Sequence, residues 1–205
     1  MRRVTISVLT VFILSIVVAA QEPAPTAKVP TAGDGGNKNQ IYAGFVYEPT
    51  DWGAAWATYK GFNLDYTRDM GKHFAAVADF DWIRNNESQA GDLDRGNPHN
   101  SKAYGYRFGP RYNLLSKRHR FQPYFVGLIG GAHFTALLPY PGRQSPLVQK
   151  DWVGFSWSIG GGADVRMTKH FGLRGEWQHQ HEPWGDQQTD SSSWDRITFG
   201  GTWRW

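Results

Sequence analysis

The chain has 205 residues and a formal net charge of +4, from 22 Lys and Arg against 18 Asp and Glu. It contains no Cys, which excludes disulfides, cysteine nucleophiles and cysteine-linked lipid anchors. The length suits a single domain, and so small a positive charge does not indicate a nucleic-acid partner.

The first segment has the form of an export signal. Arg2 and Arg3 precede a run of 17 uncharged residues, 4–20, which ends in Val18-Ala19-Ala20. Small residues at this spacing suit cleavage by signal peptidase, so we expect a signal peptide over 1–20. A membrane anchor is the alternative, but the run is at the short limit for a spanning helix and no basic stop-transfer cluster follows it. Cleavage after Ala20 removes both arginines and lowers the formal charge to +2.

Residues 21–39 form a second segment, rich in Pro, Ala, Thr and Gly and nearly free of large apolar side chains. Such a segment cannot bury enough apolar surface to order itself. We therefore expect a flexible periplasmic leader over 21–39, followed by one domain over 40–205.

From residue 40 the sequence alternates between apolar and polar residues with a period of two, which is typical of β-strands. The run 102–114 is the clearest, with Tyr104, Tyr106 and Phe108 on one face and Arg107 and Arg111 on the other. The run 121–134 is apolar on both faces, so its two sides cannot be assigned. The eight runs cover 40–48, 57–67, 73–83, 102–114, 121–134, 152–167, 171–181 and 194–205.

The connections between these runs alternate in length. Short turns near 69–72, 116–119 and 168–170 separate longer links over 49–56, 84–101, 135–151 and 182–193. This pattern predicts an all-β fold, an eight-stranded antiparallel up-and-down transmembrane β-barrel with its long loops outside the cell. The alternative is a soluble eight-stranded barrel or sandwich, which would bury the aromatic face and expose the polar one.

The polar face favours the transmembrane reading. It carries five acids and five arginines but no lysine, and Arg is favoured where ion pairs are enclosed. We therefore expect the aromatic side chains to face lipid and the charges to fill the lumen. An eight-stranded barrel is only wide enough for side chains to fill, so we expect no open pore. The proposed lumen network consists of Asp65, Asp79, Asp81, Arg107, Arg111, Asp164, Arg174, Glu176, Arg196 and Arg204.

The last eight residues, 198–205, alternate up to a final Trp. Tryptophan residues at strand ends are typical of the membrane interface. The octet resembles the C-terminal recognition signal of bacterial outer-membrane barrels. The matching positions of this proposed barrel-assembly signal are Thr198, Gly200, Trp203 and Trp205.

Further motifs resemble those of one family. They are Tyr106-Arg107-Phe108-Gly109-Pro110-Arg111-Tyr112, Pro123-Tyr124-Phe125-Val126-Gly127 followed by Gly130-Gly131, Ile159-Gly160-Gly161-Gly162-Ala163-Asp164-Val165, and Arg174-Gly175-Glu176. Over about 38–205 the chain is similar to the bacterial outer-membrane β-barrel family, the small OmpA/OmpX-like eight-stranded barrels. The resemblance implies the outer membrane as location, outer-membrane lipid and lipopolysaccharide as surroundings, the barrel-assembly machinery as a partner during insertion, and an extracellular ligand that it does not identify. Roles differ within the family, so the fold does not give the function.

Catalysis is the main alternative to a structural or surface-interaction role, because some eight-stranded barrels modify lipid A. His179, His181 and Glu182 lie close in sequence to the end of the seventh run, and Ser191, Ser192 and Ser193 lie across the same loop. A hydrolase needs a Ser within reach of a His that a carboxylate orients, and two His on one strand face could bind a metal. Polar residues at a strand end are the commoner explanation, so we assign no catalytic residue, metal or cofactor.

Two other segments leave alternatives open. The apolar link 136–150 could dock a partner at the cell surface, dip into the outer leaflet or fold over the barrel mouth. The basic turn 117–120 suits an interfacial anchor facing anionic headgroups rather than a nucleic-acid patch. A narrow channel for ions or small solutes is a third possible function.

Overall fold

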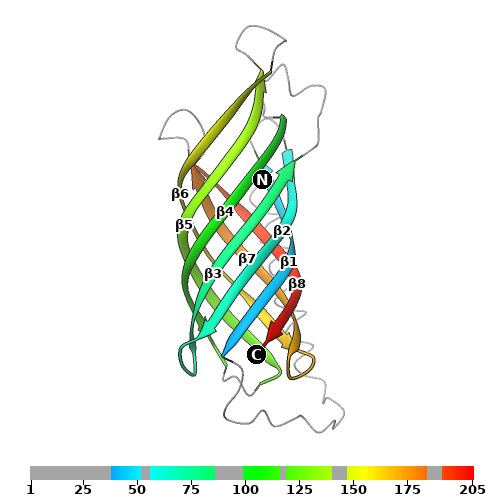
Figure 1. Ribbon diagram of the computed structural model, residues 1–205, viewed down its shortest axis with the longest axis vertical. Helices are drawn as coiled ribbons and strands as arrows, with labels where there is room; N and C mark the ends of the chain where they lie inside the picture. The colour runs from blue at the N-terminus through cyan, green and yellow to red at the C-terminus, as the bar shows by residue number, and fades with distance from the viewer. Residues whose placement is uncertain (1–37, 52–55, 86–98, 116–118, 140–146, 184–190) are drawn as a thin grey trace. The chain divides into compact units, whose positions relative to one another are not determined.

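The computed structural model describes residues 38–51, 56–85, 99–115, 119–139, 147–183 and 191–205. These residues form eight β-strands (Figure 1), and none of them forms a helix long and apolar enough to cross a membrane. The strands are β1 (Asn39–Asp51), β2 (Trp56–Asp69), β3 (Phe74–Asn85), β4 (His99–Asn113), β5 (Phe121–Pro139), β6 (Leu147–Arg166), β7 (Phe171–Pro183) and β8 (Ser191–Arg204).

Every strand pairs antiparallel with its neighbours in sequence, and β1 pairs with β8, so the sheet closes into a barrel. The register of the closing pair runs from Gln40 opposite Arg204 to Tyr47 opposite Ile197. Two backbone hydrogen bonds join Asn39 and Trp205 beyond it, at 3.2 and 3.1 Å. The predicted fold class is therefore confirmed, including the even number of strands, which places the start of β1 and the end of β8 side by side.

The two ends of the barrel differ in their connections. The turn end carries the connections 70–73, 114–120 and 167–170 together with Asn39 and Trp205, and the loop end carries the connections 52–55, 86–98, 140–146 and 184–190. The strands are longer at the loop end than the sequence patterns predict. In particular, β5 and β6 have 19 and 20 residues and pair up to Pro139 opposite Leu147, so much of the link expected over 135–151 is strand. Figure 1 shows these two strands rising beyond the others.

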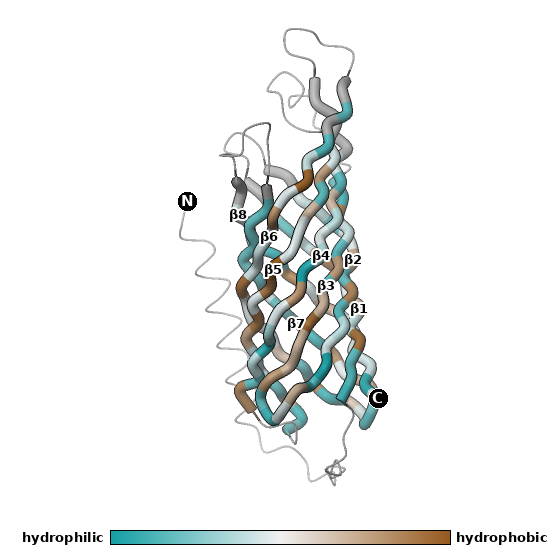
Figure 2. Tube along the Cα trace, turned by 60° about the vertical axis from the view of Figure 1, so that its left-hand side comes forward, coloured by the Kyte–Doolittle hydropathy of each residue, from teal (hydrophilic) through white to brown (hydrophobic). Residues whose placement is uncertain are grey.

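Side chains alternate between the two faces of the barrel wall, and Figure 2 shows this alternation in hydropathy along the strands. Large apolar side chains lie outside, where Phe108 is 63% and Phe199 62% exposed, while Arg196 inside is 0% exposed. Such a surface suits lipid and not water. The structure also assigns the two faces of the fifth strand, with Phe125 and Ile129 outside. Its buried face carries Gln122, Tyr124, Val126, Leu128 and Phe134.

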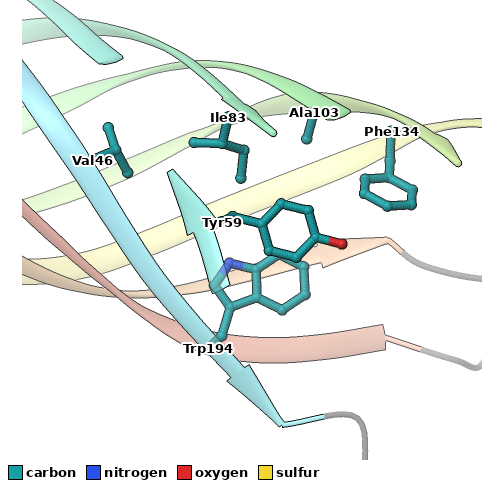
Figure 3. Packing of buried hydrophobic residues seen from close by; sticks show 6 residues of the cluster. All are labelled: Val46, Tyr59, Ile83, Ala103, Phe134 and Trp194. Atoms are coloured by element: carbon teal, nitrogen blue, oxygen red, sulfur yellow. The ribbon is translucent and has the colours of Figure 1, made fainter. Parts of the chain in front are cut away.

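The buried face of β5 contributes to an apolar cluster inside the barrel, toward the loop end. Phe134 packs there against Tyr59, with ring centroids 6.3 Å apart, and stacks on Trp152 at 5.6 Å. Figure 3 shows the cluster converging from six strands. Its buried members are Val46, Tyr59, Ile83, Ala103, Phe134 and Trp194. Sequence patterns alone did not predict an apolar layer inside the barrel.

Candidate functional site

The structure places all ten residues of the proposed lumen network on strands whose polar face points inward. Nine of them are buried, and Arg204, at the turn end of β8, keeps 12% of its side chain exposed. Nine of the ten form two groups at different heights along the barrel axis, both inside the lumen. The group called the outer cluster consists of Asp79, Asp81, Arg107 and Arg196. The group called the inner cluster consists of Asp65, Arg111, Asp164, Arg174 and Arg204. Glu176 on β7 lies near both groups.

The outer cluster joins two adjacent acids of β3 to arginines of β4 and β8. Arg107 donates from Nε to Asp79 at 3.1 Å and also pairs with Asp81. Arg196 reaches the same two carboxylates, at 3.1 Å from Asp79 and 2.5 Å from Asp81. Because each arginine binds both acids, the cluster ties together strands that are not neighbours in the sheet.

Two further acids enter this region, and both were missed from sequence. Glu182 on β7 accepts a 3.0 Å bond from Arg107, and Glu48 on β1 accepts a 2.8 Å bond from Gln180. The period of two could have found Glu48, because it lies on the same face as Tyr42 and Val46. Glu182 was taken for a rim residue because the predicted strand ends at His181, two residues before the observed end at Pro183. The outer region of the lumen is therefore richer in carboxylates than the sequence indicated.

The inner cluster is centred on one carboxylate. Asp164 on β6 accepts hydrogen bonds from Arg111 at 2.8 Å, Arg174 at 2.7 Å and Arg204 at 2.9 Å. Arg174 also donates to Asp65 at 2.8 Å, across the barrel. Here three arginines face two acids, whereas the outer cluster holds two arginines and two acids.

Tyrosine side chains lie between the arginines. The guanidinium carbon of Arg111 lies 3.5 Å from the ring centroid of Tyr124, and that of Arg174 lies 4.8 Å from the ring of Tyr42. These are cation–π distances, which are most favourable where water is excluded. The Tyr124 hydroxyl donates to Glu176 at 2.5 Å, which connects the inner cluster with the acid between the two groups. Tyr124 was missed because the faces of the fifth run could not be assigned from sequence.

This arrangement can fill and brace a barrel. Buried charges are costly to remove from water, and this cost is offset only when partners and hydrogen bonds are all in place. The described interior holds the two charged clusters, the apolar cluster around Phe134 and a smaller apolar cluster around Val126, so side chains of both kinds occupy it. An eight-stranded barrel has little further room inside.

The histidines at the loop end lie on the outside of the barrel. His181 contacts the Ser193 hydroxyl at 2.9 Å and stacks on Trp157 at 5.5 Å, while His179 contacts Asp195 at 3.0 Å. Glu182 points to the opposite face and binds Arg107, so it does not orient His181. Among the described residues no carboxylate contacts His181. Among the described side chains, neither His179 nor His181 contacts both a Ser and a carboxylate, so these side chains assemble no Ser–His–carboxylate relay of the kind that a hydrolase uses.

Metal binding also finds no support in the described ranges, where no group of three or more His, Asp or Glu side chains is arranged to hold an ion. The side chains of Ser191 and Ser192 lie outside the described part of the chain. The same holds for the side chains of 136–139, 147, 148 and 150, and for Tyr140, Lys117 and Arg118. At the turn end, Arg120 donates to the backbone carbonyl of Arg166 at 3.0 Å.

The residues of the proposed assembly signal lie along the seam between β8 and β1. Thr198 is buried inside, and Gly200 lies directly opposite Gly44. Trp203 and Trp205 are exposed on the outside at the turn end. There Trp203 stacks on His170 at 5.6 Å, and Trp205 packs near Tyr66 at 6.5 Å. These aromatic contacts form part of a belt typical of a membrane interface.

Comparisons with known proteins agree with this architecture. A family model for the outer membrane protein beta-barrel domain matches residues 10–200. No curated protein sequence matches the chain. Ail, the attachment invasion locus protein of Yersinia pestis, is 17% identical, with a TM-score of 0.57 over 83% of this chain and 99% of Ail. Ail has also been crystallised with the heparin analogue sucrose octasulfate.

Two other solved structures have a similar fold. Neisserial surface protein A is 10% identical, with a TM-score of 0.59 over 82% of this chain and 96% of that protein. OprG from Pseudomonas aeruginosa is 13% identical, with a TM-score of 0.51 over 83% of this chain and 96% of OprG. At these identities the likeness concerns the fold, and the charge clusters above are features of this chain.

Proposed function

We propose, since the chain belongs to the outer membrane protein beta-barrel family, that it works at the cell surface through the loop end of its barrel. The chain is an integral outer-membrane β-barrel with a charged interior. The proposal adds that no solute passes through this interior, that the loop end faces outward, and that the contacts made there are its function.

The filled interior carries this proposal. Each charged cluster joins strands from opposite sides of the barrel, as in the bonds from Arg174 to Asp65 and from Arg196 to Asp79. A solute entering the lumen would have to break several such bonds at once. Above them, the apolar cluster around Phe134 would repel hydrated ions. These side chains support a structural role for the interior and leave the outer surface for interaction.

The loop end offers a surface that suits contact with another molecule. Strand β6 pairs with β5 from Leu147 onward, but its pairing with β7 begins only at Trp157 opposite His181. Among the described strands, therefore, none pairs with residues 147–156 on the β7 side. Unpaired strand edges are known sites for the docking of extended chains. Val153, which is 70% exposed, lies within this stretch.

The remaining expectations from sequence form part of the same proposal. Removal of a signal peptide over 1–20 and a periplasmic leader over 21–39 would deliver the barrel domain, 40–205, to the outer membrane. The signal at Thr198, Gly200, Trp203 and Trp205 would then be read by the barrel-assembly machinery. Lipopolysaccharide and other outer-membrane lipids would surround the aromatic face, and an extracellular ligand would bind at the loop end.

Cells with and without the protein distinguish this proposal from its two alternatives. We expect altered adhesion to host cells or to a heparin-coated surface, with unchanged lipid A mass and unchanged uptake of small solutes. Heparin is a suitable first surface because its analogue binds Ail. A shift in lipid A mass would replace the proposal with an enzyme, and a change in solute uptake would replace it with a channel.

A further inference from the structure

Strands β4 and β8 end at the turn end of the barrel with the same contacts. Asn113, the last residue of β4, donates from its backbone N–H to the carbonyl of His73 at 2.7 Å, and the His73 imidazole bonds to the Asn113 carbonyl through Nδ1 at 2.8 Å. Arg204, the last residue of β8, makes the same two bonds with His170, at 2.8 and 2.9 Å. Each strand end is therefore held by the histidine that directly precedes the neighbouring strand, β3 or β7.

The residue before each strand end carries an aromatic ring on the outside of the barrel, against the same histidine. Tyr112 stacks on His73 with ring centroids 5.7 Å apart, and Trp203 stacks on His170 at 5.6 Å. The interplanar angles of these two stacks are 26° and 23°. The two strand ends therefore match in their side-chain contacts as well as in their backbone bonds.

A glycine lies three residues before each of these aromatic residues. A β-carbon on Gly109 would overlap the backbone carbonyl oxygen of Gly127 in β5, and a β-carbon on Gly200 would overlap that of Ala43 in β1. The close approach of the next strand therefore requires glycine at both positions.

Aligned on the glycine and the aromatic residue, the segment 107–114 of β4 corresponds to the segment 198–205, which carries the proposed assembly signal. A polar residue stands at the first position of both segments, and an exposed phenylalanine follows it. The last position differs, because Leu114 stands where the C-terminal segment has Trp205. The segment of β4 therefore matches the proposed signal at three of its four positions.

The other two strands that end at the turn end, β2 and β6, lack this combination. Aligned by the equivalent backbone bond at the strand end, β2 has Asp65 at the glycine position and Arg68 at the aromatic position. In β6 the glycine position is kept by Gly162, but Val165 stands at the aromatic position. Among the described strands, therefore, the combination is specific to β4 and β8.

We propose that the segment 107–114 of β4 is a second binding segment for the barrel-assembly machinery, used together with 198–205 while the barrel is inserted. An unpaired strand binds a protein by adding to the edge of its sheet, where backbone bonds give affinity and alternate side chains give specificity. Two such segments on one chain raise the effective concentration of each for the machinery. In the closed barrel β4 lies between β3 and β5, so the contact is confined to assembly.

The proposal rests on one part of the proposed function, the binding of the C-terminal segment by the same machinery. The alternative is that Tyr112 serves only the closed barrel, as one of the aromatic side chains at the membrane interface. The two explanations differ in what they predict for folding without the machinery. A residue of the interface belt acts in any bilayer, whereas a residue of a binding segment acts only when the machinery is present.

The test measures the folding rate of the full chain in vesicles of phosphatidylcholine and phosphatidylethanolamine, with and without purified barrel-assembly machinery. The readout is the acceleration, which is the ratio of the two rates. The site variant is Tyr112→Ala, and Tyr112→Phe is the conservative variant that keeps the ring. The matched control is Phe125→Ala, because Phe125 is an exposed aromatic residue of β5 directly opposite Tyr112. Trp203→Ala is the reference variant in the C-terminal segment.

We expect Tyr112→Ala to reduce the acceleration roughly three- to tenfold, through the loss of one aromatic contact with the machinery, while Tyr112→Phe and Phe125→Ala keep it. A merely structural role would slow Tyr112→Ala by the same factor with and without the machinery, and the unchanged acceleration would overturn the proposal. An equal loss of acceleration in Phe125→Ala would also overturn it, because any exposed aromatic residue at that level would then serve. Should Tyr112→Ala fail to fold without the machinery, Leu114→Ala replaces it under the same criteria.

The reference variant separates this proposal from the one on which it rests. Loss of acceleration in Trp203→Ala alone would overturn the second segment and leave the C-terminal signal in place. Loss of acceleration in Tyr112→Ala alone would support binding of 107–114 and overturn the C-terminal signal. Unchanged acceleration in both variants would overturn both.

Discussion

Removing Arg107 tests whether the interior is held together by its charges. Arg107 donates to Asp79 at 3.1 Å, to Glu182 at 3.0 Å and to Gln180 at 3.0 Å, and it also pairs with Asp81. In Arg107→Met the side-chain volume is roughly kept, but the acids of the outer cluster retain only Arg196. Breaking a buried ion pair from one side costs about 3–5 kcal/mol, because it leaves an uncompensated charge. That is a large share of a typical total stability of about 5–15 kcal/mol.

The assay is unfolding by urea in lipid vesicles, followed by tryptophan fluorescence. A second variant, Arg107→Met with Asp81→Asn, removes one of the charges left unpaired, and we expect it to recover about 1–3 kcal/mol of the loss. The control variant is Arg68→Met, which replaces an exposed arginine at the turn end. This variant should change the free energy of unfolding by less than about 0.5 kcal/mol. A loss below about 1 kcal/mol in Arg107→Met, made worse by Asp81→Asn, would refute the reasoning.

Three further predictions concern the seam between β8 and β1, the apolar cluster around Phe134 and the last residue. Gly200→Ala should block barrel closure in refolding assays, because a β-carbon at this position would overlap the backbone of β1. The control Gly201→Ala should refold normally, because a β-carbon there makes only ordinary van der Waals contacts. Phe134→Ala should lower the free energy of unfolding by about 3–5 kcal/mol, and Tyr59→Phe by only about 0.5–1.5 kcal/mol for its 2.6 Å bond to Ser101. Trp205→Ala should leave refolding in vitro nearly normal but reduce the heat-modifiable, folded fraction in cells, and an unchanged fraction in cells would count against an assembly signal.

The fold could be predicted because successive residues of a strand in a membrane barrel face two different environments, lipid on the outside and the polar lumen on the inside. Strand β4 is the best example, since Tyr106 and Phe108 face outward while Arg107 and Arg111 are buried between and beside them. The strand β5 could not be divided in this way. Its inner face carries Val126 and Leu128, which pack with Val77 and Tyr124 inside the barrel, so both of its environments are apolar.

The strand ends were less predictable for a related reason. Beyond the membrane both faces of a strand meet water or protein, so the alternation of hydropathy fades while the hydrogen-bonded ladder continues. This explains why the pairing of β5 with β6 up to Pro139 and Leu147 was read as a loop. It also explains why Glu182 was not recognised as a lumen residue, although it lies inside and binds Arg107.

The sequence could not predict which charged side chains of the lumen pair with one another. The pattern gives the face of each charged residue but not its height in a tilted barrel, so it cannot say that Arg174 meets Asp65 across the barrel or that three arginines converge on Asp164. Those contacts depend on the register of all eight strands. The division into an outer and an inner cluster, with tyrosines between the arginines, follows from that register.

Ion conductance through the refolded protein in a planar lipid bilayer tests the central claim most directly, with Arg107→Ala measured beside the wild type. The charged clusters and the apolar layer around Phe134 predict no steady current from the wild type, and a measurable current once Arg107 no longer ties Asp79, Asp81 and Glu182 together. A steady current from the wild type would contradict the account, because the interior would then be an open path and the protein a channel.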